Sequence, residues 1–303
     1  MEDHSALLKQ ADAFNKKVKS TKQKQKKERR GITMNMFKKI TMFFLLILNI
    51  NNVLINRILD VNSIGKAAEP LRHAFQQAYE VGWRFQANLN FSNAMSDFFD
   101  TKAVAWAFYL IFTVFGCIAL PMLCYILVDG FQKSQRIRWD IIEMGGFALL
   151  SEIPYDLATS GKWMDYKSQN LFFGFFIGLL VLAALKKIAE KWPEAKYVRY
   201  GLNILVVAVG LIISMLGLSY YLCFPVLIMV LMYAFRSSKL MGSVAGCMTM
   251  MTMSTYYLCS MLSLIPIAAY NGKPGKKMGY VLYLFYPITL LVLYFIAKGM
   301  NLY

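Results

Sequence analysis

The amino-acid sequence predicts an all-α fold, a polytopic integral membrane bundle of about eight transmembrane helices. The first reason is composition, because 57% of the 303 residues are hydrophobic and only 17% are charged. A water-soluble domain of this size needs more polar side chains to cover its core. The second reason is that long apolar runs follow one another along the chain. The third is the net charge of +16, which is concentrated before the first apolar run.

The apolar runs define the expected spans. About 30 Å of hydrocarbon must be crossed at a rise of 1.5 Å per residue, and each run is long enough or nearly so. The third run is short and is interrupted by charged residues. The expected spans are residues 40–58, 103–128, 141–158, 169–185, 201–218, 220–235, 243–269 and 278–297.

The lysines and arginines indicate how these spans are oriented. With the N-terminal tail in the cytoplasm, most Lys and Arg fall on the cytoplasmic side. We therefore expect a multi-pass protein of the cytoplasmic membrane with both termini in the cytoplasm. One loop does not fit, because Lys273, Lys276 and Lys277 would then lie outside. Either segment 243–269 is not a simple span and includes a re-entrant piece, or this basic loop binds an anionic group outside.

Two regions are expected, a basic cytoplasmic tail of residues 1–35 and a membrane domain of residues 36–303. Residues 1–39 contain twelve Lys and Arg, and no aromatic residue interrupts their clusters. Such a tail is attracted to anionic lipid or to a cytoplasmic partner, whereas nucleic acid is the less favoured partner. Within the membrane domain, residues 59–102 form an extracytoplasmic segment with the pattern of an interfacial amphipathic helix, in which His73 is an ordinary interfacial residue.

The metal-binding residue types argue against a metal site and against a resident cofactor. The chain has only two histidines, His4 and His73, which excludes a multi-histidine site. Its five cysteines all lie in apolar segments and have neither CxxC nor Cys/His metal spacing. We therefore expect free buried thiols and no bound cofactor.

A pair of carboxylates is the clearest candidate for chemistry inside the membrane. Glu152 and Asp156 are four residues apart, so they share a helix face. Pro154 between them is expected to kink or end the helix. Ionisable groups at this depth are costly, which makes the pair a candidate acid/base or cation-handling site. The equally weighted alternative is that both acids only stabilise the kink.

Several amides and hydroxyls lie near this pair or in other spans. Gln169 and Asn170 open the next span and can bind the acids or a ligand, or simply cap a helix. Asn49, Asn51 and Asn52 lie in the outer half of the first span. Amides cannot act as general bases near neutral pH, so these three are expected to bridge helices.

Six short blocks occur in a fixed order along the chain. They are LVDGF at 127–131, FALLSEIPYDLA at 147–158, QNLFF at 169–173, LSLIP at 262–266, YNGK at 270–273 and LFYP at 284–287. Each block alone is a weak signal, but the ordered set is specific. Together they resemble the TraX-like family of the membrane acyltransferase superfamily, over about residues 36–298.

The resemblance implies a multi-helix acyltransferase fold in the bacterial inner membrane. The family's named member acetylates the N-terminus of conjugative pilin. The implied reaction moves an acetyl group from cytoplasmic acetyl-CoA, as co-substrate, to an exported or membrane acceptor such as a peptide, glycan or lipid. Such a reaction needs a base, usually histidine, and a cationic site for the CoA phosphates. The candidate catalytic residues are then Glu152 and Asp156, and the candidate substrate or cavity residues are Asp129, Ser151, Gln169, Asn170, Asn271 and Tyr286.

The sequence departs from the family at positions that would transfer protons. The family typically ends its first span with an Asp-His pair, where this chain has Asn49, Asn51 or Asn52, depending on the alignment. Thr289 stands where a histidine is expected after the FYP motif. Asparagine cannot replace histidine as a base.

Three further positions depart in the same way. Cys117 and Glu143 stand where arginines are expected, and Ser219 stands where an acidic residue is expected. Cysteine cannot replace arginine as an anion clamp. Two functions therefore compete: an acetyl-CoA-dependent acyltransferase, or a catalytically degenerate relative that binds a membrane ligand or serves as an assembly subunit. A transporter is a weaker third reading, because no inverted repeat is visible.

Overall fold

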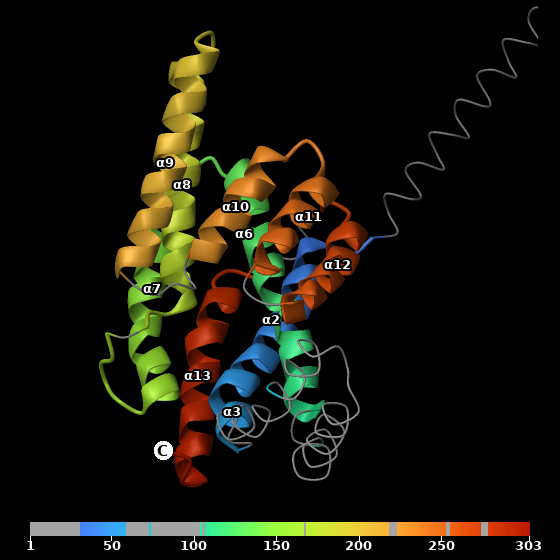
Figure 1. The fold of residues 1–303 in the computed structure, drawn as a ribbon, viewed down its shortest axis with the longest axis vertical. Coiled ribbons are helices and arrows are strands. Elements are labelled where there is room, and N and C mark those ends of the chain that lie inside the picture. The colour runs from blue at the N-terminus through green and yellow to red at the C-terminus, as the bar shows by residue number, and fades with distance from the viewer. Residues whose placement is uncertain are drawn as a thin grey trace, which may run out of the picture.

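The computed structural model describes most of the membrane domain, and the described residues are helical, with no β-strand among them (Figure 1). The all-α prediction is therefore confirmed for this part of the chain. The residues described are 31–58, 73, 104, 107–166, 168–217, 223–252, 255–273 and 278–303. Most of the basic tail and Ser219 lie outside these ranges. So does the expected helix at 59–102, except for His73, whose side chain is exposed.

The first helix is long and changes its winding near its C-terminal end. It begins at Met34, where the Thr33 side chain accepts a hydrogen bond of 3.4 Å from the Met36 amide. A π-helical turn interrupts the α-helical winding, and such turns are frequent at functional sites. The parts are α2 (Met34–Ile50), the π-helix η1 (Asn51–Ile55) and α3 (Asn56–Ile58).

Three further helices pack around the first one. The helix Ala107–Lys133 includes α6 (Ala119–Lys133), α7 runs over Ile137–Ser160, and α13 runs over Val281–Gly299. In Figure 1, α13 passes between α7 and the α2–α3 helix. One apolar core joins these elements, with Phe37 of α2 fully buried in it.

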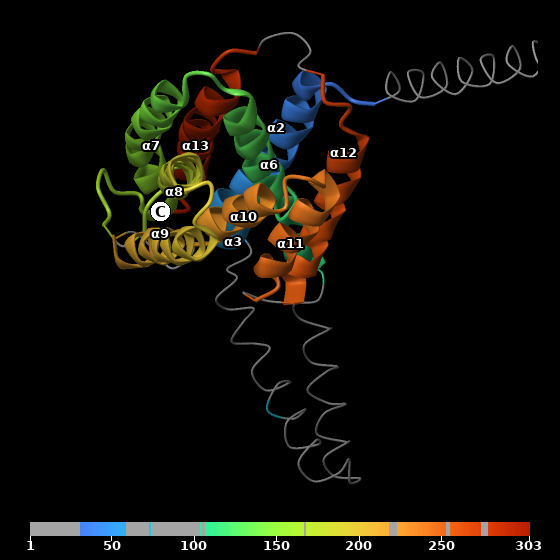
Figure 2. The same ribbon diagram turned by 90° about the horizontal axis from the view of Figure 1, so that it is seen from above.

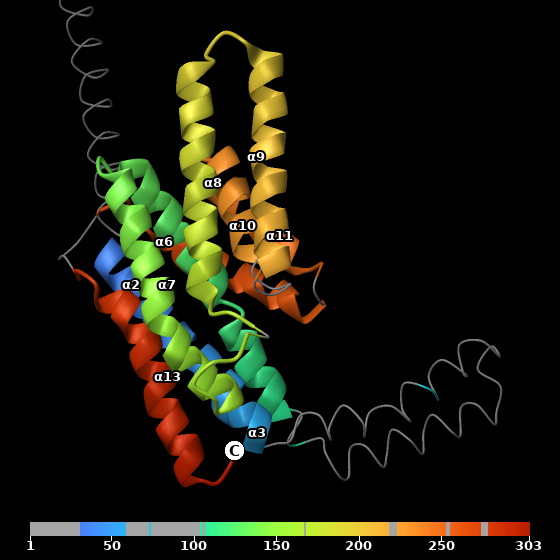
Figure 3. The same cartoon turned by 90° about the vertical axis from the view of Figure 1, so that its left-hand side faces the viewer.

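A second set of helices covers the other side of α6 and α7. Helices α8 and α9 form a long hairpin that extends beyond the other helices (Figure 3). Viewed from above, α10 lies between this hairpin and α11 (Figure 2). The elements are α8 (Leu171–Lys191), α9 (Lys196–Gly217), α10 (Cys223–Ala234), α11 (Lys239–Met250), the 3-10 helix η3 (Thr255–Ser263) and α12 (Leu264–Ala269).

The structure confirms membrane-spanning helices, whereas the expected count of eight full spans stays a prediction. Five helices of the described residues are long and apolar enough to cross a membrane: Met34–Ile58, Ala107–Lys133, Leu171–Lys191, Lys196–Met215 and Val281–Gly299. Helix α7 has 24 residues but contains four carboxylates, which lower its hydropathy. Helix α10 has only 12 residues, roughly 18 Å of rise, and cannot cross about 30 Å of hydrocarbon.

The expected span 243–269 is a folded-back pair of short helical segments. Helix α11 ends at Met250, and the chain returns through η3 and α12, so that Cys247 Sγ lies 3.4 Å from Ser263 Oγ. Threonines at the break compete for backbone carbonyls, which weakens the helix. Thr249 Oγ1 donates to the Gly246 carbonyl and Thr252 Oγ1 donates to the Thr249 carbonyl, both at 2.7 Å.

The segment after α12 returns to the beginning of α2. Ile32 and Tyr270 form a parallel β-bridge, and the Met34 amide donates to the Lys273 carbonyl at 2.8 Å. We call residues 31–34 with 269–273 the tail clasp. Lys273 therefore lies beside the start of α2, at the end of the protein that we call the tail face, which fits the alternative that 243–269 is not a simple span. Lys276 and Lys277 are outside the described residues.

The C-terminus lies at the opposite end of the α2–α3 helix. The Arg57 guanidinium lies 4.3 Å from the centroid of the Tyr303 ring, and the Tyr303 hydroxyl donates to the Ala158 carbonyl at 2.7 Å. The C-terminus therefore packs at the end of the α2–α3 helix that is away from the tail. The expectation that both termini lie in the cytoplasm stays a prediction.

Helix α7 also continues through its proline. Pro154 lies inside α7, which extends to Ser160, so the helix does not end at the proline, and a kink there stays a prediction. The helix ends at Gly161, whose φ of 73° is the left-handed conformation that glycine adopts without strain. The Gly161 amide donates to the Leu157 carbonyl at 3.0 Å, which closes the last turn.

Candidate functional site

A polar cavity of about 490 Å³ lies inside the membrane domain. It is bounded by the end of α2 with η1, by the helix that leads into α6, by the end of the loop between α7 and α8, and by side chains of α10, α11 and α13. Among the described residues that line it, none is charged. The lining residues are Leu48, Asn49, Asn51, Asn52, Asn56, Tyr109, Thr113, Gly116, Cys117, Leu120, Tyr155, Ser168, Gln169, Leu171, Phe224, Met250 and Tyr286.

The first wall presents asparagine amides in fixed orientations. Asn49 Nδ2 donates to Thr289 Oγ1 at 2.8 Å, and Asn51 Nδ2 donates to Thr113 Oγ1 at 3.2 Å. Both asparagines are buried, and Asn51 Oδ1 has no hydrogen-bond partner among the described residues. Asn52 follows on the same turn and is exposed to the cavity. The asparagines thus bridge helices, as expected, and also leave an amide oxygen free to accept a hydrogen bond.

The π-helical turn explains how neighbouring asparagines reach one cavity. A π-turn holds an extra residue compared with an α-helical turn. The far end of the turn is held by Arg57, whose Nη1 donates to the Val53 carbonyl and whose Nη2 donates to the Thr159 carbonyl of α7, both at 2.6 Å. The widened turn is therefore tied to a second helix rather than left free.

A backbone carbonyl on the second wall has lost its usual helical partner. The helix Ala107–Lys133 has a local turn at Cys117–Ile118, just before α6. Pro121 has no N–H, so it cannot donate to the Cys117 carbonyl four residues earlier. A carbonyl released in this way is tolerated at membrane depth only where it faces protein or a water-filled cavity. Cys117 lines the cavity, which meets that condition.

The third wall is formed by hydroxyls and aromatic rings. The Tyr155 hydroxyl of α7 donates to Ser168 Oγ at 3.4 Å, and Gln169 follows Ser168 in the lining. Tyr286 of α13 packs against Phe172, with ring centroids 4.8 Å apart. The buried walls therefore offer amide, phenol and hydroxyl groups, which are suited to hydrogen bonding with an uncharged ligand.

The two candidate catalytic acids face the loop between α7 and α8 and are not among the residues that line the cavity. The Glu152 carboxylate accepts hydrogen bonds from the Asn170 amide at 3.3 Å and from Asn170 Nδ2. Asn170 Nδ2 also donates to the Ala148 carbonyl at 2.7 Å, and its Oδ1 caps α8 by accepting from the Phe172 amide at 3.0 Å. Glu152 therefore anchors the first turn of α8 to the middle of α7.

Asp156 holds the same loop one turn further along α7. Its Oδ2 accepts a hydrogen bond of 3.0 Å from the Asp165 amide. Its Oδ1 and the Ser151 hydroxyl are buried and have no partner among the described residues. Each acid contacts a different part of the loop between α7 and α8. Their positions therefore fit a role in stabilising the local structure better than a role as a catalytic pair.

Asp129 and Asn271 lie on the tail face instead of in the cavity. Asp129 Oδ2 accepts from Lys133 Nζ at 2.7 Å and from the Tyr270 hydroxyl at 3.3 Å. Burial raises the pKa of Tyr270, so its hydroxyl stays protonated and can donate to Asp129 at neutral pH. Asn271 Nδ2 donates to the Gly31 carbonyl at 2.9 Å, which makes it part of the tail clasp.

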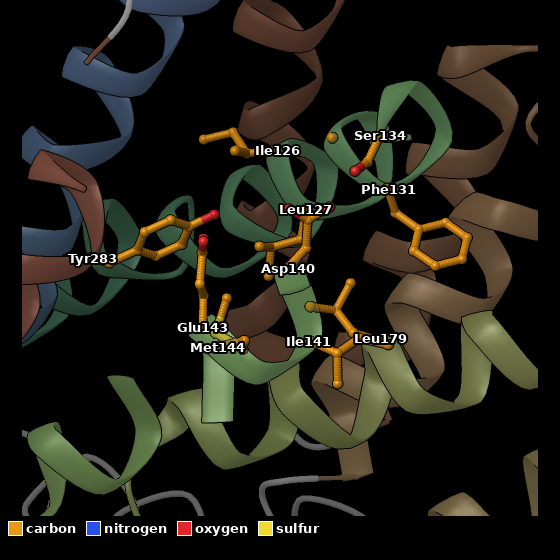
Figure 4. Close-up of a pocket in the computed structure, with 11 residues that line it drawn as sticks. Ile126, Leu127, Phe131, Ser134, Asp140, Ile141, Glu143, Met144, Leu179 and Tyr283 are labelled. Carbon is orange, nitrogen blue, oxygen red and sulfur yellow. The ribbon is translucent and has the colours of Figure 1, made fainter. Parts of the chain in front are cut away.

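Glu143 lies in a second, smaller cavity of about 180 Å³ on the tail face (Figure 4). Arg136 Nη2 lies 3.5 Å from its carboxylate, and the Tyr280 hydroxyl donates to it at 3.1 Å. Figure 4 also shows the Tyr283 hydroxyl pointing toward this carboxylate. Asp140 lines the same cavity, so two carboxylates occupy it. Arg136 Nε also lies 3.7 Å from the Asp140 carboxylate, so one arginine pairs with both acids.

Most of the positions at which the chain departs from the family pattern gather around the larger cavity. Asn49, Asn51, Asn52 and Cys117 line it, and Thr289 binds Asn49. Sequence reasoning did not identify the other hydroxyls of the lining. Tyr155 lies inside the SEIPYD run and could have been found there, whereas Thr113 has no local signal because its partner Asn51 is 62 residues away.

These observations define the class of protein: an α-helical membrane protein whose apolar helices enclose a cavity lined in part by amides and hydroxyls. The chain belongs to the TraX family, whose family model, described as TraX protein, matches residues 34–297. This confirms the resemblance found in the sequence blocks. No curated protein and no solved structure matches the chain.

Proposed function

We propose that this TraX-family protein binds an uncharged polar group of a membrane or exported molecule in the asparagine-lined cavity, without transferring an acetyl group. The observation that supports this most directly is the lining itself, whose described residues include amides and phenols and no charged side chain. Hydrogen-bonding groups that are shielded from water bind a complementary ligand strongly, because an unpaired buried group costs about 1–3 kcal/mol. Asn51 Oδ1, buried and unpaired among the described residues, is such a group.

The chemistry of the lining argues against acetyl transfer in this cavity. Transfer requires a base to take the proton of the acceptor, and amides cannot do so near neutral pH. It also requires cationic groups for the CoA phosphates, and the described part of the cavity lining contains no lysine, arginine or histidine. The described lining therefore has the hydrogen-bonding groups that binding needs, without the base and the cationic groups that acetyl transfer needs. We place the protein in the cytoplasmic membrane of a bacterium, with the tail toward the cytoplasm.

Octyl glucoside is a suitable probe, because it joins an uncharged sugar to an apolar chain. We expect it to raise the unfolding temperature of the wild-type protein in lipid nanodiscs. Asn51→Leu and Asn52→Leu should remove most of that increase, whereas Gln135→Leu, an exposed amide outside the cavity, should not. An equal increase in all four proteins would reject the cavity as the binding site.

A second candidate function is acetyl transfer with Glu152 as the base. The observation in its favour is that Glu152 binds Asn170, and the preceding residue, Gln169, lines the cavity. In this reaction the acceptor N–H or O–H loses its proton to Glu152 while its nitrogen or oxygen bonds to the acetyl carbon. The thioester C–S bond breaks, and CoA leaves as the thiol after taking up a proton.

Labelled acetyl-CoA with protein in liposomes tests this candidate. Glu152→Gln retains a hydrogen-bond acceptor for Asn170 but removes the base, so transfer should fall by at least about 100-fold if Glu152 is the base. The isosteric Asp156→Asn is the matched control, because Asp156 contacts the loop at Asp165. Absence of both transfer and CoA binding in the wild-type protein would eliminate this candidate.

A further inference from the structure

A second large hollow of about 820 Å³ runs between α8, α9 and α10. Figure 3 shows α10 beside the α8–α9 hairpin, and the hollow is lined by side chains of these three helices and of the turn after α10. Most of its lining is aliphatic, including Leu185, Ile204 and Leu211. We call it the α8–α10 slot. It is separate from the asparagine-lined cavity, with which it shares no residue.

One end of the slot is basic. Arg199 lies in the first turns of α9 and Arg236 lies just after α10. These helices run in opposite directions, so both arginines come to the same end of the slot, which lies on the tail face. Among the described residues, no carboxylate lines the slot and neither arginine forms an ion pair.

Neighbouring groups hold both arginines in place. Arg199 Nη1 donates to the Pro193 carbonyl at 3.4 Å, and its guanidinium lies 5.9 Å from the centroid of the Tyr200 ring. Arg236 Nη1 donates to the Tyr233 carbonyl at 3.2 Å, and its guanidinium lies 4.7 Å from the centroid of that ring. Each guanidinium has five N–H donors, so several remain for an anionic ligand.

An unpaired polar atom lies one helical turn deeper. Asn203 lines the slot four residues after Arg199, and its Oδ1 is buried without a partner among the described residues. Beyond Asn203 the lining along α9 is apolar as far as Leu211. The distance along α9 from Arg199 to Leu211 is roughly 18 Å, which provides a long apolar contact for a hydrocarbon chain.

We infer that the α8–α10 slot binds an anionic phospholipid of the tail-side leaflet. The lipid phosphate contacts Arg199 and Arg236, a headgroup or glycerol hydroxyl donates to Asn203 Oδ1, and one acyl chain lies along α9. The match of charge at one end and apolar surface along the rest identifies a lipid rather than a water-soluble anion. Juxtamembrane arginines attract anionic lipids in this way.

Native mass spectrometry of the full-length protein with phosphatidylglycerol tests the inference, with phosphatidylcholine as the comparison lipid. We expect phosphatidylglycerol to bind at least tenfold more tightly than phosphatidylcholine. Arg199→Gln and Arg236→Gln should each weaken phosphatidylglycerol binding by about tenfold, since charge-assisted hydrogen bonds to phosphate are lost. Arg138→Gln removes an exposed arginine outside the slot and should leave binding unchanged.

A second pair of variants tests the apolar part of the slot. Ala208→Trp fills the slot and should reduce binding of phosphatidylglycerol, whereas Leu205→Trp places the same ring on the exposed side of α9. Size-exclusion profiles establish that both variants are folded. Equal binding of the two lipids, equal losses in Arg138→Gln and the slot arginine variants, or equal binding by the two tryptophan variants would overturn the inference.

Discussion

Asn49 Nδ2 donates a hydrogen bond of 2.8 Å to Thr289 Oγ1, and this bond joins the first long helix to the last one. Thr289 also donates to the Tyr286 carbonyl at 2.9 Å, so its hydroxyl is fully used. The two residues are 240 positions apart, and Asn49 is buried. The bond therefore fixes how α2 and α13 pack beside the cavity.

We predict that the two side chains are energetically coupled. Asn49→Ala and Thr289→Val should each lower the free energy of unfolding by about 1–2 kcal/mol. The double variant should be less destabilised than the sum by about 0.5–1.5 kcal/mol, because the same bond is removed in both single variants. Unfolding in lipid nanodiscs measures this cycle. Additive effects would contradict the bond.

The end of α7 offers a matched pair of glycines. At Gly161 a Cβ would lie 2.7 Å from the Tyr303 ring, and the residue has a φ of 73°. Gly161→Ala should therefore destabilise the protein by about 1–3 kcal/mol. Gly146, inside α7, has open space at its Cβ position. Gly146→Ala should be neutral or stabilise by up to about 1 kcal/mol. Similar melting temperatures for both variants would refute the described contact with Tyr303.

The start of α8 depends on Asn170. Asn170→Ala removes the helix cap and leaves the Glu152 carboxylate without its side-chain donor, so we expect a loss of about 2–3 kcal/mol. Gln169→Ala is the control, because Gln169 precedes the cap. Hydrogen exchange at the first turn of α8 should increase in Asn170→Ala alone. Unchanged protection there would show that Glu152 does not anchor this helix.

A reagent that cannot cross the membrane should reach the two ends of the α2–α3 helix from opposite sides of the membrane. Tyr197 lies near the tip of the α8–α9 hairpin on the tail face and Trp163 lies after α7 at the other end, and both side chains are exposed. In intact cells an impermeant maleimide should label Trp163→Cys, and Tyr197→Cys should react only in inside-out vesicles. The parent protein with its native cysteines is the control. Labelling of both positions from one side would contradict this orientation.

Hydropathy was sufficient to find the long helices, because each of them needs an apolar surface along its whole length. It could not find the break after Met250, since the residues before and after it are equally apolar and only the hydroxyl contacts of Thr249 and Thr252 mark it. The remaining signal was the basic loop, because an outside position for Lys273 is avoided if 243–269 includes a re-entrant piece, and the structure shows such a fold-back.

The candidate site was predicted in part. The asparagines of the first helix were identified as bridges, and the structure adds their partners Thr113 and Thr289. These partners lie on other helices, so no local pattern could show them. The acids were the best candidates for chemistry because an ionisable side chain inside a membrane is energetically costly. That cost does not show which way a side chain points. Glu152 and Asp156 each contact the loop after α7.

The shortness of α10 and α11 has a consequence for the surrounding lipid. Each has 12 residues, roughly 18 Å of rise, while helices such as α13 have 19 residues. One side of the protein is therefore matched to a thick bilayer and the other to a thin one. Adjacent lipids must thin or tilt to cover the short side, at a cost of a fraction of a kcal/mol per Å. Bilayer thickness thus becomes an external control on this protein, and short-chain lipids should stabilise it over long-chain ones.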